Sequence, residues 1–247
     1  MADSQPKKLI LIDAGHGGPN DEGAVFTDQS GQVWRECDLT IQIARRVLNL
    51  LQADGRFMVM TTNEALDFPR DAACAARDRR EMLGEYAMNA AAAGQPVSFL
   101  ISIHVNSTEK RSSKPSGIVV CYNADAASAQ QMKDSIIQNG AAAGEDLAGN
   151  RASNVVRRPE LSMLNLPFPS LLVECGFIQN PHDFALLTSE RGQALLAQSI
   201  AEGLSKLMWG TPLQQGRLLA ADWPLDWSKF VPIPAPEPQI RPPLQKH

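Results

Sequence analysis

Four residues of this chain have the types and positions that metal-assisted hydrolysis requires. His16, His104 and Glu174 each follow a short apolar run, and Glu36 begins a helical pattern. In an open α/β sheet, ligands bind just beyond the carboxyl ends of the strands, so these side chains are expected to lie at one edge of one sheet. Two histidines and a carboxylate suit zinc, and a second carboxylate nearby is the group that zinc hydrolysis needs as a base. The set therefore indicates a metallohydrolase.

Each of the first two residues also has a simpler interpretation. His16 lies in Gly15-His16-Gly17-Gly18, where glycines allow the backbone to approach a ligand closely, but a histidine in a tight turn needs no chemistry. Glu36 lies on the same helical stripe as Leu39 and Ile43, so its carboxylate is expected to face inward and to need a partner. A negative charge at a helix N-terminus is also favourable in its own right.

The other two residues follow apolar runs that resemble buried strands. His104 is either a ligand or a hydrogen-bonded structural histidine, and its neighbours Ser102 and Asn106 are either its partners or turn formers. Glu174 is a candidate general base, and the alternative for it is a salt bridge to an arginine elsewhere in the chain. His182 has the sequence of a helix start, so it is a weaker candidate.

The elements that must position these residues alternate between apolar runs and amphipathic patterns. Strands are predicted at Leu9–Asp13, Phe57–Thr61, Phe99–Val105, Gly117–Tyr122 and Leu171–Glu174. Helices are predicted at Glu36–Gln52, Pro69–Ala93, Ala126–Leu147 and Ser189–Met208, the last with Ser189 as its N-cap.

This alternation predicts an α/β fold with a twisted, mostly parallel sheet and helices on both faces. The segment between Val105 and Gly117 is short, polar and without a helical pattern. A parallel crossover needs a longer connection, so the next strand is expected to run antiparallel and the sheet to be mixed.

Bulk composition sets further limits. The 247 residues carry a net charge of −4 and no basic cluster, which excludes nucleic acid as an expected partner. No apolar run reaches the roughly 18 residues of a membrane span, and no signal peptide is expected at the start of this chain. The cysteines lack CxxC spacing and are expected to be buried and reduced: Cys37, Cys74, Cys121 and Cys175.

The domain organisation is expected to change near residue 210. Residues 1–210 are predicted to form the catalytic domain, and residues 211–247 a tail or linker rich in tryptophan and proline. Trp223 and Trp227 are expected to pack against the domain or to bind a ligand, and His247 ends the tail.

Four ordered motifs resemble those of the zinc-dependent N-acetylmuramoyl-L-alanine amidases of the Amidase_3 type. They are Ile12-Asp13-Ala14-Gly15-His16-Gly17-Gly18, then Glu36 at a helix start, then Ser102-Ile103-His104-Val105-Asn106, then Leu172-Val173-Glu174-Cys175-Gly176-Phe177-Ile178-Gln179-Asn180-Pro181. The resemblance extends from about Lys8 to Met208. It implies one Zn²⁺ on His16, Glu36 and His104, with Glu174 as the catalytic residue, and a twisted, mostly parallel sheet.

The resemblance also implies the substrate and the setting. The expected reaction is hydrolysis of the amide between N-acetylmuramic acid and L-alanine of the peptidoglycan stem peptide, by a monomer that acts on the cell wall. A chain without a leader fits a phage enzyme released at lysis or the mature part of a periplasmic or secreted enzyme. The loops Ser107–Ser116 and Gly149–Asn165 are expected to form groove walls, where Arg157 and Arg158 are either solvated or meet stem-peptide carboxylates.

Two features depart from the usual pattern of the family. An arginine usually stands shortly before an Ala-Asn pair in the helix that precedes the second histidine motif. Here Met88 precedes Asn89 and the nearest arginine is Arg80, so no role is assigned to it. Ser107–Ser170 is expected to contain one strand, one helix and loops, with no room for the inserted helix that plugs the site in some relatives, which predicts an open site.

Two other classes are less consistent with the sequence. Mononuclear Fe(II) oxygenases also use two histidines and a carboxylate, but the spacing and the α/β alternation here do not fit them. A catalytically silent wall-binding module would have no need of Glu174.

Overall fold

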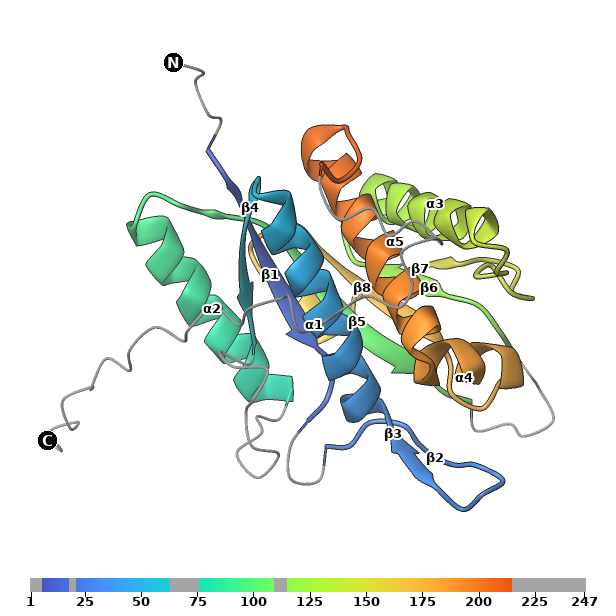
Figure 1. Cartoon of the computed structure of the whole chain (residues 1–247). Coiled ribbons are helices and arrows are strands. Elements are labelled where there is room, and N and C mark those ends of the chain that lie inside the picture. Colours follow the sequence, from blue (N-terminus) through green and yellow to red (C-terminus); the bar gives the residue numbers. More distant parts are fainter. Residues whose placement is uncertain (1–5, 18–20, 63–75, 109–114, 215–247) are drawn as a thin grey trace, which may run out of the picture.

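A six-stranded sheet with the strand order β4-β1-β5-β8-β6-β7 forms the centre of the molecule (Figure 1). The computed structural model describes residues 6–17, 21–62, 76–108 and 115–214. In sheet order the strands are Phe57–Thr61 (β4), Lys8–Ala14 (β1), Val97–Asn106 (β5), Ser170–Phe177 (β8), Val119–Tyr122 (β6) and Val155–Arg157 (β7). All five predicted strands are therefore present.

The sheet is mixed, as the sequence predicts. Strands β4, β1, β5 and β8 run parallel to one another, β6 runs antiparallel to β8, and β7 is parallel to β6. The short polar connection after β5 does lead into a strand of opposite direction. However, that strand pairs with β8 and not with β5, because β8 occupies the place beside β5.

Five helices lie among the described residues. They are Glu36–Asp54 (α1), Ala76–Ala92 (α2), Ala126–Ala142 (α3), Pro181–Thr188 (α4) and Glu190–Trp209 (α5). Ser189 caps α5 by accepting a hydrogen bond from the Gly192 amide, as predicted. The predicted end of the third helix at Leu147 is wrong: α3 ends at Ala142, and Gly144 has a φ of +77° that a helix cannot contain. The predicted start of the second helix at Pro69 lies outside the described residues.

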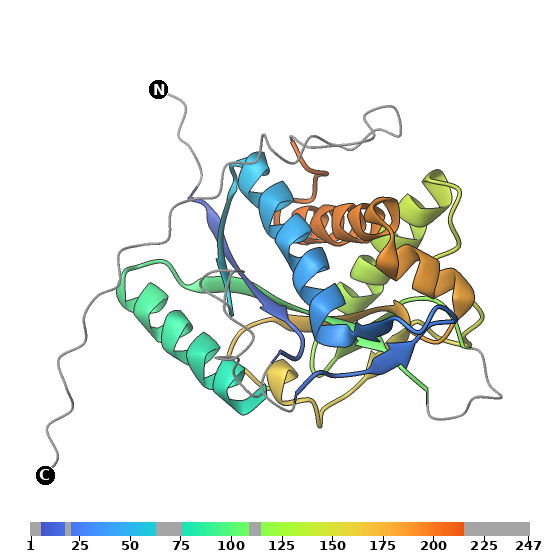
Figure 2. The same cartoon turned by 60° about the horizontal axis from the view of Figure 1, so that its bottom comes forward.

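Helices cover both faces of the sheet, as Figure 2 shows: α1, α3 and α5 lie on one side and α2 on the other. The alternation of side chains along the strands explains this arrangement. Ile10 and Ile12 of β1 belong to the large core under α1, α3 and α5, whereas Leu11 packs with Leu83 of α2 on the opposite face. Leu39 and Ile43, on the predicted stripe of α1, are fully buried in the large core.

Several short elements were not predicted. Val25–Thr27 (β2) and Val33–Arg35 (β3) form an antiparallel hairpin that leads directly into α1. Strand β7 and the 3-10 helix Ser162–Leu164 (η2) lie within a segment expected to be a loop, so that expectation is wrong for Gly149–Asn165. Three-residue elements carry too few residues to show a hydrophobic period.

The end of the described chain packs against the domain. The Leu213 amide donates a hydrogen bond to Glu202 of α5, and the Gln214 amide donates to Asp54 of α1. The rest of the predicted tail, with Trp223, Trp227 and His247, lies outside the described residues. Within the described ranges, no helix has the length and the apolar character needed to cross a membrane.

Candidate metal centre

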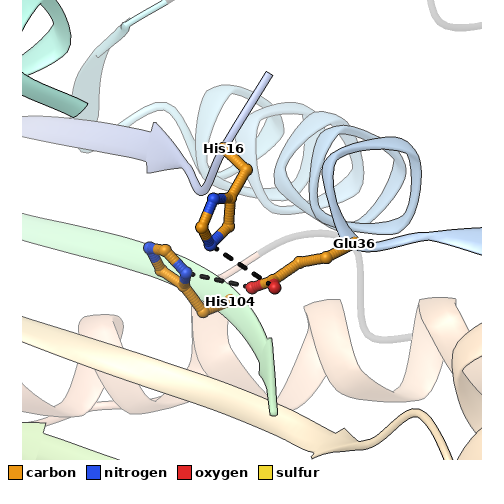
Figure 3. A group of neighbouring side chains, drawn as sticks. All are labelled: His16, Glu36 and His104. Atoms are coloured by element: carbon orange, nitrogen blue, oxygen red, sulfur yellow. Dashed lines mark hydrogen bonds and ion pairs between the residues drawn. The ribbon is translucent and has the colours of Figure 1, made fainter. Parts of the chain in front are cut away.

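His16, Glu36 and His104 converge at the edge of the sheet where β1 and β5 end (Figure 3). Their candidate ligand atoms all lie within 4.8 Å of one another. Nε2 of His16 lies 3.4 Å from Oε2 of Glu36, and Nδ1 of His104 lies 3.0 Å from Oε1 of the same carboxylate. The structure thus brings together the three residues that were predicted as ligands from distant parts of the sequence.

His16 is held in an unusual backbone conformation. Its φ of +60° makes it the one non-glycine residue with positive φ among the residues described. This region is sparsely populated by residues with a Cβ, and such conformations concentrate at functional sites. Oδ1 of Asp21 accepts a hydrogen bond from Nδ1 of His16 at 2.6 Å, which leaves Nε2 facing Glu36.

Glu36 is the first residue of α1, and its side chain turns into the site. The amide of Ala24 donates to Oε2 and the amide of Val105 donates to Oε1, both at 2.9 Å. Burial works against the charged form, but the hydrogen bond and the charge of His104, the charge of His16 and the Ala24 amide outweigh it and lower the pKa of Glu36. These contacts exclude a role limited to stabilising its own helix.

His104 lies near the end of β5, and its side chain is partly buried. Burial lowers its pKa, but the hydrogen bond to Glu36 and the nearby charges of Glu174, Glu36 and Asp13 raise the pKa above its ordinary value overall. The backbone approaches the ring closely, because a Cβ added at Gly15 would lie 2.5 Å from Cε1 of His104. Glycine at position 15 is therefore needed for the ring to occupy its place.

Glu174 is the register partner of His104 on the neighbouring strand β8. Its side chain is partly exposed, but Oε2 is buried and has no hydrogen-bond partner in the structure as described. The predicted alternative, a salt bridge to an arginine, does not form among the described residues. Burial, with a further contribution from the charge of Glu36, raises the pKa of Glu174 to about 7, against the opposing charges of His104 and Arg158. A carboxyl group with these properties is suited to general acid–base chemistry at neutral pH.

The raised pKa of Glu174 has a consequence for stability. The carboxyl group of Glu174 binds its proton more tightly in the metal-free folded protein than in the unfolded chain. Above pH 7 the ionised group therefore lowers the free energy of unfolding by the full amount, and this loss disappears as the pH falls toward 4.5. Glu174→Gln is therefore expected to stabilise the metal-free protein at pH 8 by about 2–3 kcal/mol. Urea unfolding in the presence of a chelator at pH 8 and pH 4 measures this difference. An equal gain at both pH values would contradict the prediction.

Gly23 packs against two of the three candidate ligands. Its φ is +69°, and an added Cβ would lie 2.6 Å from Oε2 of Glu36 and 2.7 Å from Cδ2 of His16. Gly23→Ala is therefore expected to displace both side chains and to weaken zinc binding by about 10–100-fold, the range seen when groups that orient metal ligands are altered. Competition with a chromophoric chelator measures the affinity.

Gly31→Ala is the matched control for this substitution. Gly31 also has a positive φ, of +87°, but an added Cβ would meet nothing within 4 Å. It is expected to cost stability of about 1 kcal/mol and to leave zinc affinity unchanged. Equal losses of affinity in the two variants would assign the effect to backbone strain alone.

The other polar residues considered in the sequence have structural roles. Ser102 donates to Asp13 and not to His104, and Asn106 accepts from the adjacent Ser107 amide. His182 is at the start of α4, as predicted, where Asn180 caps the helix. Arg157 donates to the Asn123 carbonyl.

Cys121 and Cys175 are buried and form no disulfide, as predicted. Cys37 is partly exposed, so the expectation of burial is wrong for it, and Cys74 lies outside the described residues. Burial raises the pKa of the Cys121 thiol to about 12 and raises the pKa of Cys175 as well. Neither buried thiol is therefore available as a thiolate.

Sequence reasoning missed three residues that surround the site. Asp21 bonds His16, and Arg79 of α2 contacts both Asp21 and Asp13. Arg80, the arginine nearest to Asn89, received no role from the sequence, and the buried arginine is its neighbour Arg79. One signal was available: Asp13 stands inside an apolar strand, where a carboxylate needs a cationic partner.

The fold and the site define an α/β protein whose sheet edge carries a centre of the kind found in hydrolytic metalloenzymes. Residues 10–206 match the family model described as N-acetylmuramoyl-L-alanine amidase, and the chain belongs to this family. Peptidoglycan hydrolysis at the amide bond that the family name specifies is the function that this membership supports.

Three relatives illustrate the similarity. The germination-specific N-acetylmuramoyl-L-alanine amidase of Bacillus subtilis is 30% identical over 205 residues, which cover 80% of this chain and 78% of the relative. The amidase AmiC of Neisseria meningitidis is 26% identical, and the match covers 85% of this chain but only 55% of that protein. The structure of the amidase AmiC2 of Nostoc punctiforme superposes with a TM-score of 0.63 at 27% identity, covering 81% of this chain and 97% of the other.

Proposed function

We propose that the protein is a zinc-dependent hydrolase of peptidoglycan that cleaves the amide between N-acetylmuramic acid and L-alanine of the stem peptide. The observation that carries the zinc dependence is the convergence of His16, Glu36 and His104 from three separate elements. The catalytic domain is assigned to residues 1–210, and the monomer is proposed to act on the cell wall.

The donor set fits zinc in chemistry and in space. Two imidazole nitrogens and a carboxylate oxygen are the ligands of many catalytic zinc sites, which keep a further position open. Glycines stand where any side chain would fill the space between the ligands, because added Cβ atoms at Gly15 and Gly23 would collide with the His104 ring and with Glu36. The buried, unpartnered Oε2 of Glu174 lies one strand away from His104.

Zinc, when bound, supplies a Lewis acid that polarises the amide carbonyl and lowers the pKa of water. Glu174 removes a proton from the attacking water as the new C–O bond forms. The same carboxyl group then delivers this proton to the nitrogen of L-alanine as the C–N bond breaks. The products are a muramic acid carboxylate and a stem peptide with a free amino terminus, which accounts for the atoms of amide and water.

The experiment that tests this function is digestion of purified peptidoglycan by the zinc-loaded protein, with mass spectrometry of the soluble products. Stem peptides with an L-alanine amino terminus are expected, and none are expected from a Glu174→Ala control. Glycan fragments with intact stem peptides would show a different bond specificity. Binding to peptidoglycan without products from the zinc-loaded protein would make it a wall-binding module.

The predicted open site can be tested with the same assay. Helix α3, the one long helix described between Ser107 and Ser170, packs against α5, and Lys206 of α5 lies 3.5 Å from Ser135 of α3. It does not occupy the metal centre. We propose that turnover needs no activating partner, and a purified protein that binds zinc yet digests peptidoglycan only after a partner is added would contradict this.

A further inference from the structure

A chain of charged groups, buried at Asp13 and Arg79 and partly exposed at Asp21, connects helix α2 to the imidazole of His16. Nε of Arg79 donates to Oδ1 of Asp13 at 3.1 Å, and its Nη1 donates to Oδ2 of Asp21 at 3.3 Å. The other oxygen of Asp21 accepts from Nδ1 of His16 at 2.6 Å. One guanidinium thus links a strand, a loop and an imidazole of the candidate centre.

Arg79 is itself held in place by a buried carboxylate. Its side chain is only 3% exposed, and Asp13 is fully buried on β1. Asp13 also accepts a hydrogen bond from Oγ of Ser102 on β5 at 2.6 Å, so its orientation is set by two elements of the sheet. The planar guanidinium can serve two carboxylates at once, which the single ammonium group of a lysine does less well.

The contact of Asp21 determines which nitrogen of His16 is available. A neutral imidazole carries one N–H, and a carboxylate that accepts from Nδ1 leaves Nε2 with a lone pair. That Nε2 faces Glu36 in the centre. Carboxylates that accept from the second nitrogen of a ligating histidine fix its tautomer and increase its basicity.

We propose that Asp21 and Arg79 are positioning residues for the metal: Asp21 holds the Nδ1 proton of His16, and Arg79, anchored on Asp13, orients Asp21. This inference rests on the proposed role of His16 as a zinc ligand. It assigns functions to two residues outside the ligand set and explains why an arginine is buried beside two aspartates.

The first test measures zinc affinity of the full chain by competition with a chromophoric chelator. Asp21→Ala is expected to weaken zinc binding by about 10–100-fold, and Asp21→Asn, which retains an accepting oxygen, by less. Glu22→Ala is the matched control, because Glu22 is the adjacent carboxylate and pairs with Arg35 instead. Equal affinities in wild type and Asp21→Ala would overturn the proposal.

The second test observes the imidazole directly in the metal-free protein. Nitrogen-15 NMR of the histidine side chains distinguishes Nδ1–H from Nε2–H. His16 is expected to be the Nδ1–H tautomer in the wild type and in Glu22→Ala, and to lose that preference in Asp21→Ala. An Nε2–H tautomer in the wild type would contradict the proposal, whatever the activity.

The role of Arg79 is tested by a double-mutant cycle with Arg79→Lys, which keeps a positive charge beside Asp13. If Arg79 acts through Asp21, Arg79→Lys is expected to weaken zinc binding alone but to add less than about threefold in the Asp21→Ala background. Additive losses would show that Arg79 acts by another route. A cooperative thermal unfolding transition, measured for each variant, verifies that the variant folds.

The outcomes separate this inference from the proposed function. A wild-type protein that binds no zinc would refute the zinc dependence itself. A wild-type protein that binds zinc and an Asp21→Ala variant that binds it equally well would refute only the positioning role.

Discussion

Glu174→Gln is expected to lower the turnover of peptidoglycan by about 10²–10⁴-fold while zinc remains bound, because it removes the proton acceptor without touching a ligand. The amide of glutamine has nearly the shape of the carboxyl group but cannot take up a proton at neutral pH. Glu174 has the properties of that acceptor: an unpartnered buried oxygen and a pKa raised to about 7. Its position opposite His104 in the strand register places it beside the proposed metal ligands.

The measurement is the release of stem peptides together with zinc content by elemental analysis. Glu145→Gln is a matched control, since Glu145 follows α3 and pairs with His182 and Arg191, away from the centre. This control is expected to retain wild-type rates. Near-normal turnover in Glu174→Gln would remove Glu174 from the mechanism, and loss of zinc would show that it acts as a ligand.

His16→Ala and His104→Ala are expected to lose zinc and, with it, all turnover. If each of the three ligands supplies an equal part of the ~10–16 kcal/mol typical of bound zinc, removal of one weakens binding by about 10²–10⁴-fold. Glu36 accepts hydrogen bonds from the Ala24 and Val105 amides, which neither substitution removes, so its carboxylate is expected to stay in place in both variants. The loss is therefore attributed to the missing imidazole and not to a displaced carboxylate.

Chelator competition and zinc content after dialysis test this expectation. His182→Ala is the control, because His182 lies at the start of α4 and is half exposed. It is expected to keep zinc and activity. If a histidine variant of the centre bound zinc as tightly as the control, the assigned ligand set would be wrong.

Glu174→Gln and His104→Ala also separate the role of the base from the role of the metal. Glu174→Gln is expected to remove the base and keep the metal, and His104→Ala is expected to remove the metal and keep the base. The stability gain expected for Glu174→Gln in the metal-free protein adds a third observation. If Glu174 serves catalysis at a cost to the free energy of unfolding, its replacement is expected to stabilise the fold.

The sequence by itself determined the fold class and singled out the four residues that we propose for the site. Continuous apolar runs such as that around Ile10 and Ile101 indicate strands buried on both faces, and the stripe of Leu39 and Ile43 indicates a helix packed on the sheet. These signals are local, since side-chain periodicity is a property of each segment. The positions of His16, His104 and Glu174 at strand ends were predictable for the same reason.

Only the tertiary structure decided which segments are neighbours. Nothing in the short connection after β5 shows that β8 comes to lie between β5 and β6, because strand pairing joins residues far apart in the chain. The three-residue strands β2, β3 and β7 owe their form to such pairing and not to a pattern of their own.

The surroundings of the centre depend on tertiary structure in the same way. Arg79 and Asp13 are 66 residues apart in sequence, and Glu36 and Val105 are 69 apart, yet each pair is joined by a hydrogen bond. The sequence shows only that a charged residue in an apolar strand requires a partner, and not which residue that partner is. The partner is chosen by the packing of α2 and β5 against β1, which is a property of the folded chain as a whole.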